Sequence, residues 1–251
     1  MELHQLIYEA GLHLLAAVLH PMVWGPALLI FWLLTKERRR YKKTAYYKIT
    51  RCPYRKMQED KGRIGEYETY RELQAFEKQG GRFLFNLYIP KHDGETTEID
   101  LLMVSTRGLF VVESKNYSGW IFGSEYRRYW CQTLPAGDGD YTKEYFYNPV
   151  MQNSAHIRWL RNLLGSPLPM WSIVAFSDRC TLKDVELSGE KAQVVVRDDV
   201  FGTVSEIWDR EEEVLTEEEA DEIYDALYPY TQADRSVKEQ HIADVCGWSG
   251  E

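Results

Sequence analysis

The sequence predicts one α/β domain that follows a single membrane-spanning helix. From residue 62 onward, apolar residues alternate between helical and extended spacing, which is typical of an α/β domain. Residues 10–35 contain no Asp, Glu, Lys or Arg. The composition, 44% hydrophobic with a formal net charge of −9, excludes a disordered chain and a polytopic membrane protein. Its four cysteines form no Cys-x-x-Cys pair, which disfavours a zinc ribbon.

The apolar segment at residues 10–35 is long enough to span a bilayer, since about 20 apolar residues cross the hydrocarbon core as a helix. Lys and Arg follow it at once, whereas the short N-terminus has none. The positive-inside rule therefore places the N-terminus outside and the domain in the cytoplasm, on a single-pass cell-membrane anchor. Pro21 and Pro26 leave a kinked hairpin as the alternative, and the acidic N-terminus disfavours a cleaved signal peptide.

Charge is divided unevenly along the rest of the chain. Residues 36–63 carry twelve Lys and Arg against three acids, whereas residues 64–251 have a net charge of −16. We predict a basic juxtamembrane linker at residues 36–61, with residues 36–56 attracted to anionic lipid; a nucleic-acid arm is the alternative. The acidic domain disfavours unassisted binding of nucleic acid, although residues 206–225 alone hold eleven of its acids.

The domain is predicted to extend over residues 62–229, followed by a polar tail at residues 230–251. An apolar stripe of helical spacing predicts a helix over residues 62–79 that ends at Gly80. Residues 82–90 form an apolar run closed by proline, which predicts a strand. Two further runs, 98–105 and 109–115, flank a turn that contains Gly108 and predict a β-hairpin. Both runs are apolar on both faces, so this hairpin should be central in a sheet covered on both sides.

The second half of the domain shows clear helix signals. Asn148 and Pro149 are typical of an N-cap and a first helical residue, and this helix should end at Gly165. Residues 170–176 and 192–196 predict strands. Thr216 with Glu219 three residues later predicts a capping box at the start of another helix.

Three polar residues interrupt the apolar hairpin strands. Asp100 begins the first strand, and Glu113 and Lys115 end the second on one face. If the turn centres between Thr106 and Arg107, Asp100 lies opposite Glu113; a one-residue shift in the loop would make them diagonal neighbours, still within about 8 Å. Two carboxylates on facing strand positions suit Mg²⁺ or Mn²⁺. An adjacent ammonium could orient or deprotonate an attacking water and offset the negative charge of the phosphorane. This combination predicts phosphodiester hydrolysis; an ordinary buried salt bridge is the alternative.

Five sequence blocks occur in an order and spacing that resemble the nuclease-related domain, NERD. They are Gly-Arg-Ile-Gly-Glu at residues 62–66, Thr-Glu-Ile-Asp at 97–100, Gly-Leu-Phe-Val-Val-Glu-Ser-Lys-Asn-Tyr-Ser-Gly at 108–119, Trp130, and Asn-Pro-Val-Met-Gln at 148–152. The resemblance covers about residues 62–165. It implies the restriction-endonuclease-like fold of the PD-(D/E)xK superfamily, with a mixed central sheet flanked by helices and, here, preceded by one transmembrane helix.

The resemblance also implies roles for individual residues. Asp100, Glu113 and Lys115 would form the catalytic core, with Asp100 and Glu113 as ligands of Mg²⁺ or Mn²⁺. Glu66 would be a further metal ligand, although an acid near a helix N-terminus is also favoured by the helix dipole. Gln152 would support catalysis, with a solvated helix position as the alternative. We expect the remaining aromatic and histidine candidates to be packing residues. They are Tyr117, Trp120, Trp130 and His156.

These inferences predict a membrane-anchored, Mg²⁺-dependent nuclease that acts on DNA or RNA at the cytoplasmic face. The first alternative is a non-catalytic module that uses the fold to bind nucleic acid or a protein partner. The second is a membrane-tethered structural adaptor, for which the anchor matters and Asp100 does not.

Overall fold

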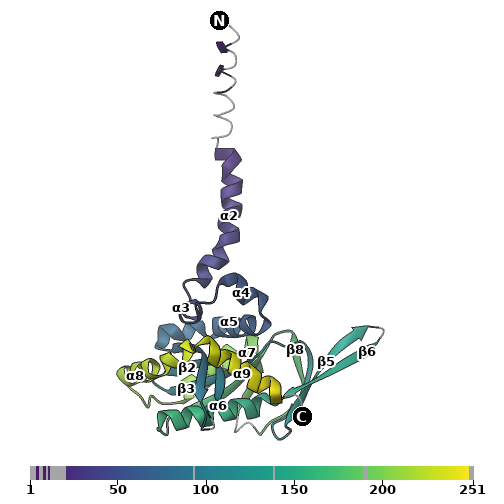
Figure 1. The fold of residues 1–251 in the computed structure, drawn as a ribbon, viewed down its shortest axis with the longest axis vertical. Helices are drawn as coiled ribbons and strands as arrows, with labels where there is room; N and C mark the ends of the chain where they lie inside the picture. The colour runs from purple at the N-terminus through teal and green to yellow at the C-terminus, as the bar shows by residue number, and fades with distance from the viewer. Residues whose placement is uncertain are drawn as a thin grey trace. The chain divides into compact units, whose positions relative to one another are not determined.

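The computed structural model describes residues 4, 5, 8, 9, 11, 21–92, 94–137, 139–188 and 192–248. The chain divides into two compact units, residues 1–44 and 45–251. The first contains helix α2 (Pro21–Tyr41; Figure 1). Leu28, Leu29 and Phe31 of α2 are exposed, and three arginines lie in its last turn. None of the helices in the described ranges is sufficiently long and apolar to cross a membrane. Residues 10 and 12–20 of the predicted span lie outside those ranges.

The second unit begins with two short helices inside the stretch that the sequence suggested as a linker. They are α3 (Ala45–Thr50) and α4 (Tyr54–Glu59). Tyr46 and Ile49 of α3 are buried, as is Met57 of α4. These apolar side chains give the segment a folded role that its charge content does not indicate, because the charged residues occupy the solvent-facing positions between them.

The helix predicted over residues 62–79 is present in two parts. Helix α5 (Lys61–Leu73) is capped by the Asp60 carboxylate, which accepts hydrogen bonds from the backbone N–H groups of Gly62 and Arg63. A 3₁₀ segment, η1 (Gln74–Gln79), tightens its end, and Gly80 closes it in the left-handed conformation with φ of +87°. Glycine suits this position because an L side chain rarely adopts such a φ.

A five-stranded mixed sheet forms the centre of the unit, in the order β1-β2-β3-β7-β9. Its strands are β1 (Arg82–Pro90), β2 (Thr96–Ser105), β3 (Gly108–Lys115), β7 (Met170–Phe176) and β9 (Gln193–Val196). Strands β1, β2 and β3 are antiparallel, whereas β3, β7 and β9 are parallel. The hairpin register is the predicted one, with Leu101 opposite Val112 and Ser105 opposite Gly108.

Helices cover both faces of this sheet, as predicted. The side chain of Glu113 contacts His156 of α6 (Pro149–Leu164), and the next residue, Ser114, contacts Thr69 of α5. Because neighbouring strand residues point to opposite faces, α6 and α5 lie on opposite sides of the sheet. The predicted cap at Asn148 is confirmed, since its side chain accepts from the N–H of Val150 at 2.9 Å.

Three further helices and a 3₁₀ segment complete the unit. They are α7 (Arg197–Arg210), α8 (Glu217–Leu227), η2 (Tyr228–Gln232) and α9 (Arg235–Trp248). Helix α7 packs against α5 and β9. The capping box of Thr216 and Glu219 is confirmed at the start of α8. Helix α9 occupies the predicted polar tail, and its His241 lies 3.2 Å from the carbonyl oxygen of Thr96.

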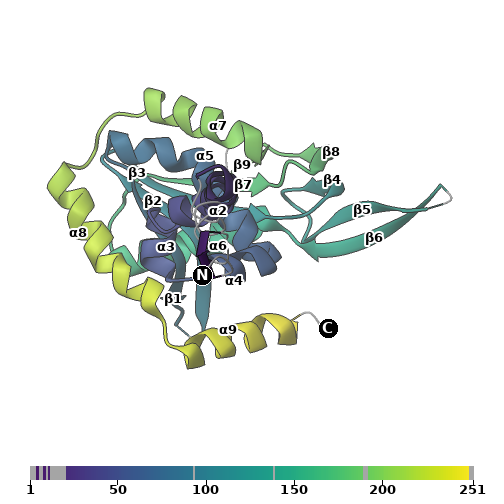
Figure 2. The ribbon, with the colours of Figure 1, turned by 90° about the horizontal axis from the view of Figure 1, so that it is seen from above.

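A second sheet of four strands, in the order β6-β5-β4-β8, was not predicted. Its strands are β4 (Gly119–Ser124), β5 (Tyr129–Gly137), β6 (Asp140–Tyr147) and β8 (Cys180–Glu186). The β5–β6 hairpin extends away from the rest of residues 45–251 (Figures 1 and 2). Strand β6 is almost entirely exposed, so it lacks the apolar run or alternation that signals a strand in a sequence.

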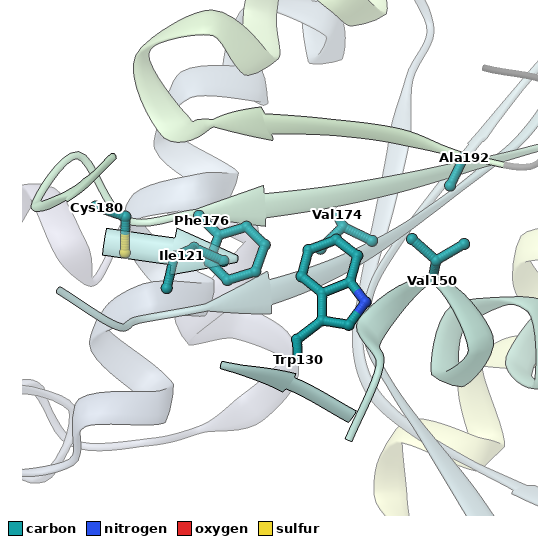
Figure 3. Close-up of a cluster of buried hydrophobic side chains, with 7 residues drawn as sticks. All are labelled: Ile121, Trp130, Val150, Val174, Phe176, Cys180 and Ala192. Atoms are coloured by element: carbon teal, nitrogen blue, oxygen red, sulfur yellow. The ribbon is translucent and has the colours of Figure 1, made fainter. Parts of the chain in front are cut away.

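One apolar cluster joins the two sheets (Figure 3). The Trp130 indole of β5 stacks on Phe176 of β7, with ring centroids 6.0 Å apart, and donates through Nε1 to the Ser124 carbonyl. Gly123 makes room for this ring, because a Cβ at that position would lie 2.2 Å from the indole. Trp130 is therefore a core residue, as the sequence favoured. The cluster consists of Ile121, Trp130, Val150, Val174, Phe176, Cys180 and Ala192.

Candidate active site

The predicted acid–acid–lysine group assembles where the end of β3 lies beside the middle of β2. Asp100 lies in the middle of β2 and immediately precedes Leu101, where the pairing of β2 with β3 begins and which lies opposite Val112. The Asp100 carboxylate accepts a hydrogen bond from the backbone N–H of Ser114 at 2.9 Å. Asp100 is thereby held beside the segment of β3 that carries Glu113 and Lys115, as the predicted register requires.

Glu113 is the most buried member of the group, with 2% of its side chain exposed. Its Oε1 lies 2.7 Å from Lys115 Nζ, and its Oε2 lies 3.2 Å from His156 Nε2. Burial favours the neutral acid, but Lys115 and His156 outweigh it and hold the pKa of Glu113 at about 2. Glu113 is therefore an ionised carboxylate in the physiological range.

Lys115 connects β3 to helix α6. Its ammonium donates a hydrogen bond to Gln152 Oε1 at 3.0 Å, in addition to its ion pair with Glu113. Burial lowers the pKa of Lys115, but the carboxylates of Glu113 and Asp100 more than offset this effect, and the pKa is raised. Lys115 is thus a hydrogen-bond donor and a fixed positive charge in this arrangement, rather than a base.

His156 is a site residue that sequence reasoning assigned to packing. It is buried, and besides contacting Glu113 it places Nδ1 2.7 Å from Thr97 Oγ1. An ionised carboxylate can only accept a hydrogen bond, so Nε2 carries a proton. The available signal was its position four residues after Gln152, which places both side chains on one face of α6.

A second group of polar residues lies next to Asp100. Asn86 of β1 falls opposite Asp100, because Phe85 pairs with Leu101 and Leu87 pairs with Ile99. It has a φ of +51°, a left-handed conformation that Asn tolerates better than most residues. Sequence reasoning did not identify Asn86, although it is the polar residue within an apolar strand.

The Glu66 carboxylate is engaged by neutral donors. Its Oε2 accepts from the Asn86 amide at 3.0 Å and from the Tyr46 hydroxyl at 2.9 Å. Burial raises the pKa of Glu66 to about 7. Burial, followed by the charges of Glu113 and Glu66, raises the pKa of Asp100 well above its usual range. Burial and the neighbouring carboxylates therefore favour the neutral acid at Asp100, and a bound cation would favour its ionised form instead.

The carboxylate oxygens of this site are donors of the type that Mg²⁺ uses. Across the described part of the chain, no group of three or more His, Cys, Asp or Glu side chains is arranged to hold a metal ion. Glu66, Asp100 and Glu113 thus do not form a compact three-carboxylate cage. Mg²⁺ commonly binds through one or two carboxylates and completes its shell with water and substrate phosphate, which Asp100 and Glu113 are able to support.

A cavity of about 460 Å³ opens beside Lys115. Its walls come from the end of β3, the start of α5, the β5–β6 hairpin and Arg179. Arg179 donates to the Asn116 side-chain oxygen at 2.8 Å, which holds its guanidinium beside this cavity. The cationic residues in the lining are Lys61, Lys115 and Arg179. Glu144 also lines the cavity, but the three cations outnumber it, which suits an anionic ligand.

Comparison with known proteins agrees with the sequence motifs. Residues 61–177 match the family model of the nuclease-related domain, and this range contains every candidate residue described above for catalysis or metal binding. The chain is also 31% identical, over 182 residues, to a protein of Bacillus anthracis described as uncharacterized. That similarity covers 72% of this chain and 82% of the relative. No solved structure matches the chain.

Proposed function

Because this chain belongs to the nuclease-related domain family, we propose that it is a metal-dependent nuclease that hydrolyses phosphodiester bonds of DNA or RNA. One observation carries the proposal: Asp100, Glu113 and Lys115 converge at the end of a buried hairpin, beside a cavity lined by cations. Buried charges are costly even when they are paired, so their clustering in an otherwise apolar sheet supports a functional site, which would provide carboxylates for a metal and an ammonium for phosphate.

Asp100 and Glu113 would hold Mg²⁺ or Mn²⁺, and Glu66, whose charge acts on Asp100, would be an additional carboxylate near the metal rather than part of a compact cage. The metal, when bound, would lower the pKa of a water and polarise the scissile phosphate. The donor set supports this choice of ion, because carboxylate oxygens are the hard ligands that Mg²⁺ and Mn²⁺ prefer.

The protein's own residues would position the reacting groups. Lys115 would donate to a phosphate oxygen and stabilise the negative charge that develops during attack. Gln152 would hold the Lys115 ammonium from α6, at the distance of 3.0 Å that the structure gives. His156, itself held by Thr97, would fix the orientation of the Glu113 carboxylate.

The test is cleavage by the purified full-length protein. We expect single- or double-stranded DNA or RNA to be cut in the presence of Mg²⁺ or Mn²⁺, and the activity to be lost on addition of EDTA. Asp100→Asn should abolish cleavage, whereas Asp209→Asn, at an exposed position of α7, should not. If the folded protein cuts none of these substrates with either metal, the nuclease proposal is wrong.

A non-catalytic binding module is the second candidate function. Both Glu113 oxygens are already engaged, one by Lys115 and the other by His156, which favours a closed structural pair over an open metal site. The melting temperature distinguishes the two functions. A metal site predicts that Mn²⁺ raises it in the wild type and not in Glu113→Gln, whereas a binding module predicts no effect in either protein.

We also propose that residues 10–35 anchor the protein in the cell membrane, with the domain on the cytoplasmic face. The basic residues 36–56 would then lie against anionic lipid. The apolar side chains that α2 exposes support this assignment. Alkaline extraction of membranes tests it: the full chain should stay in the membrane pellet, and a chain lacking residues 1–35 should be released.

A further inference from the structure

The outer face of the four-stranded sheet carries an array of exposed aromatic rings. Successive strand residues point to opposite faces, so Tyr141, Lys143, Tyr145 and Tyr147 of β6 share one side. Residues that pair across strands lie on the same side of a sheet. Tyr129 of β5 pairs with Tyr147, and Thr133 of β5 pairs with Lys143. Trp120 of β4 pairs with Thr133, so it lies on this side as well. The aromatic face is defined by Trp120 (39% exposed), Tyr129 (45%), Tyr141 (54%), Tyr145 (71%) and Tyr147 (44%).

Packing of the domain does not account for these rings. The opposite face of the same strands supplies the core, through Trp130 and Phe146, which pair across the β5–β6 hairpin. The hairpin is thus fixed by its inner side, while its outer side keeps large rings in water. A gathered set of exposed aromatic residues is typical of a binding surface, whereas single ones are common on any protein.

The rings are arranged to accept flat ligands. Trp120 and Tyr141 stack, with centroids 5.5 Å apart and planes inclined by only 24°. Lys183 places its ammonium 5.5 Å from the centre of the Trp120 ring, and Arg128 lies at the same distance from the Tyr129 ring. Stacked rings with cations beside them offer both partners that a nucleotide needs, a surface for the base and a charge for the phosphate.

The distribution of charge favours a polyanion on this face. The acids of β6, Asp140 and Glu144, alternate with the tyrosines and point to the other side. Lys143 remains between Tyr141 and Tyr145. On β8, the register places Asp184 and Glu186 on the aromatic face, at the edge of the sheet opposite β6 and therefore away from Lys143.

We propose that the aromatic face binds single-stranded nucleic acid, with bases stacked on its rings and phosphates near Lys143, Lys183 and Arg128. This rests on the proposed nuclease function, for which it names single strands as the substrate class. Exposed rings on a sheet, interleaved with cations, bind single strands because every unpaired base presents a flat face; in a duplex those faces are covered.

The aromatic face is close enough to the candidate active site for one bound nucleic-acid strand to contact both. Trp120 follows Lys115 by five residues, so their Cα atoms lie at most about 18 Å apart. The inner side of the hairpin walls the cavity with Gln132, Leu134 and Glu144. A nucleic-acid strand lying across the outer side would therefore reach Lys115 by passing the start of β4 at residues 118–120.

The experiment is binding of labelled 20-nucleotide oligothymidine, oligouridine and a DNA duplex of equal length to the full chain. Fluorescence anisotropy in EDTA measures binding without cleavage. We expect single strands of either sugar to bind more tightly than duplex, and Tyr145→Ala to weaken that binding roughly ten-fold. Tyr145→Phe keeps the ring and should bind like the wild type. Thr142→Ala, an exposed position on the other side of β6, should also have no effect.

Two results would overturn the proposal. One is equal binding of single strands by the wild type and Tyr145→Ala, or a preference for duplex. The other is unchanged oligonucleotide binding together with weaker binding of Tyr145→Ala to phosphatidylserine vesicles, which would assign the face to the membrane. Binding is measured without metal, so it does not depend on cleavage. If the protein binds single strands through these rings but does not cleave them, the nuclease proposal is wrong and the binding surface remains.

Discussion

The two sheets of residues 45–251 differ in their exposure to solvent, and this difference decides which residue types are unexpected in each. Helices cover both faces of the five-stranded sheet, so a polar side chain inside it must be paired, as Glu113 is by Lys115 and His156. The four-stranded sheet has one face exposed to solvent. Polar side chains are hydrated there at little cost, whereas large aromatic rings are unusual. In the covered sheet the informative residue is therefore a charge, and in the open sheet it is an aromatic ring.

The two regions are physically joined by Asn148 and the cluster around Trp130. Asn148 caps α6, the helix that carries Gln152 and His156, and its amide donates to the Arg127 carbonyl at 2.7 Å in the turn between β4 and β5. The same helix therefore positions residues of the candidate active site and holds the sheet that carries the aromatic face.

The largest effect should come from breaking the charge pair of the covered sheet. Lys115→Met leaves the Glu113 carboxylate buried without its cation, which should cost roughly 3–5 kcal/mol in the free energy of unfolding. Cleavage should fall by roughly 10³-fold, since a charge-stabilising donor is lost. Urea unfolding and a cleavage assay measure the two effects.

The matched control for this prediction removes both charges. Glu113→Gln combined with Lys115→Met should recover most of the stability, because no uncompensated charge remains, but none of the activity. A single Lys115→Met variant as stable as the wild type would show that the pair is not buried as described.

A smaller effect is expected from loosening the junction between the sheets. Asn148→Ala removes the cap of α6 and the bonds to the turn that precedes β5, and should lower the free energy of unfolding by roughly 2–3 kcal/mol. Asn148→Ser keeps a capping oxygen and should lose about half as much. Thermal unfolding measures both; equal losses would mean that the capping hydrogen bond contributes nothing, because both variants lose the bonds to the turn.

The smallest effect concerns the pH dependence of stability. Burial raises the pKa of Glu66 to about 7, so the folded state retains a proton that the unfolded state releases near pH 4.5. The contribution of Glu66 to stability is therefore present at low pH and is lost as the pH rises through 7. Glu66→Gln should raise the melting temperature at pH 8 by roughly 3 °C and have little effect at pH 4.

Glu72→Gln, an exposed position on the same helix, serves as the control for Glu66 and should show no pH-dependent gain. The contribution of Glu113 to stability depends on pH in the opposite direction, because its pKa is lowered to about 2. That contribution is present above about pH 4.5 and is lost as the pH falls toward 2. A Glu66→Gln variant that is less stable than the wild type at pH 8 would contradict the raised pKa.

Local features of the chain were readable from sequence. The Asn148 cap, the Thr216 capping box and the register of the β2–β3 hairpin each depend on residues close together in the chain. Their hydrogen bonds and turn geometry are set by neighbours, so the pattern alone is sufficient. The covered hairpin also pointed to Asp100, Glu113 and Lys115, because charges in an apolar strand are conspicuous.

Only the tertiary structure revealed the contacts between distant segments. The pairing of His156 with Glu113 and of Asn86 with Glu66 depends on how α6, α5 and β1 pack on the sheet, and no local pattern encodes that packing. The second sheet escaped prediction for a related reason. Its strand β6 faces water on nearly every residue, so it lacks the buried periodicity that identifies a strand, and its tyrosines become one surface only when four strands are aligned.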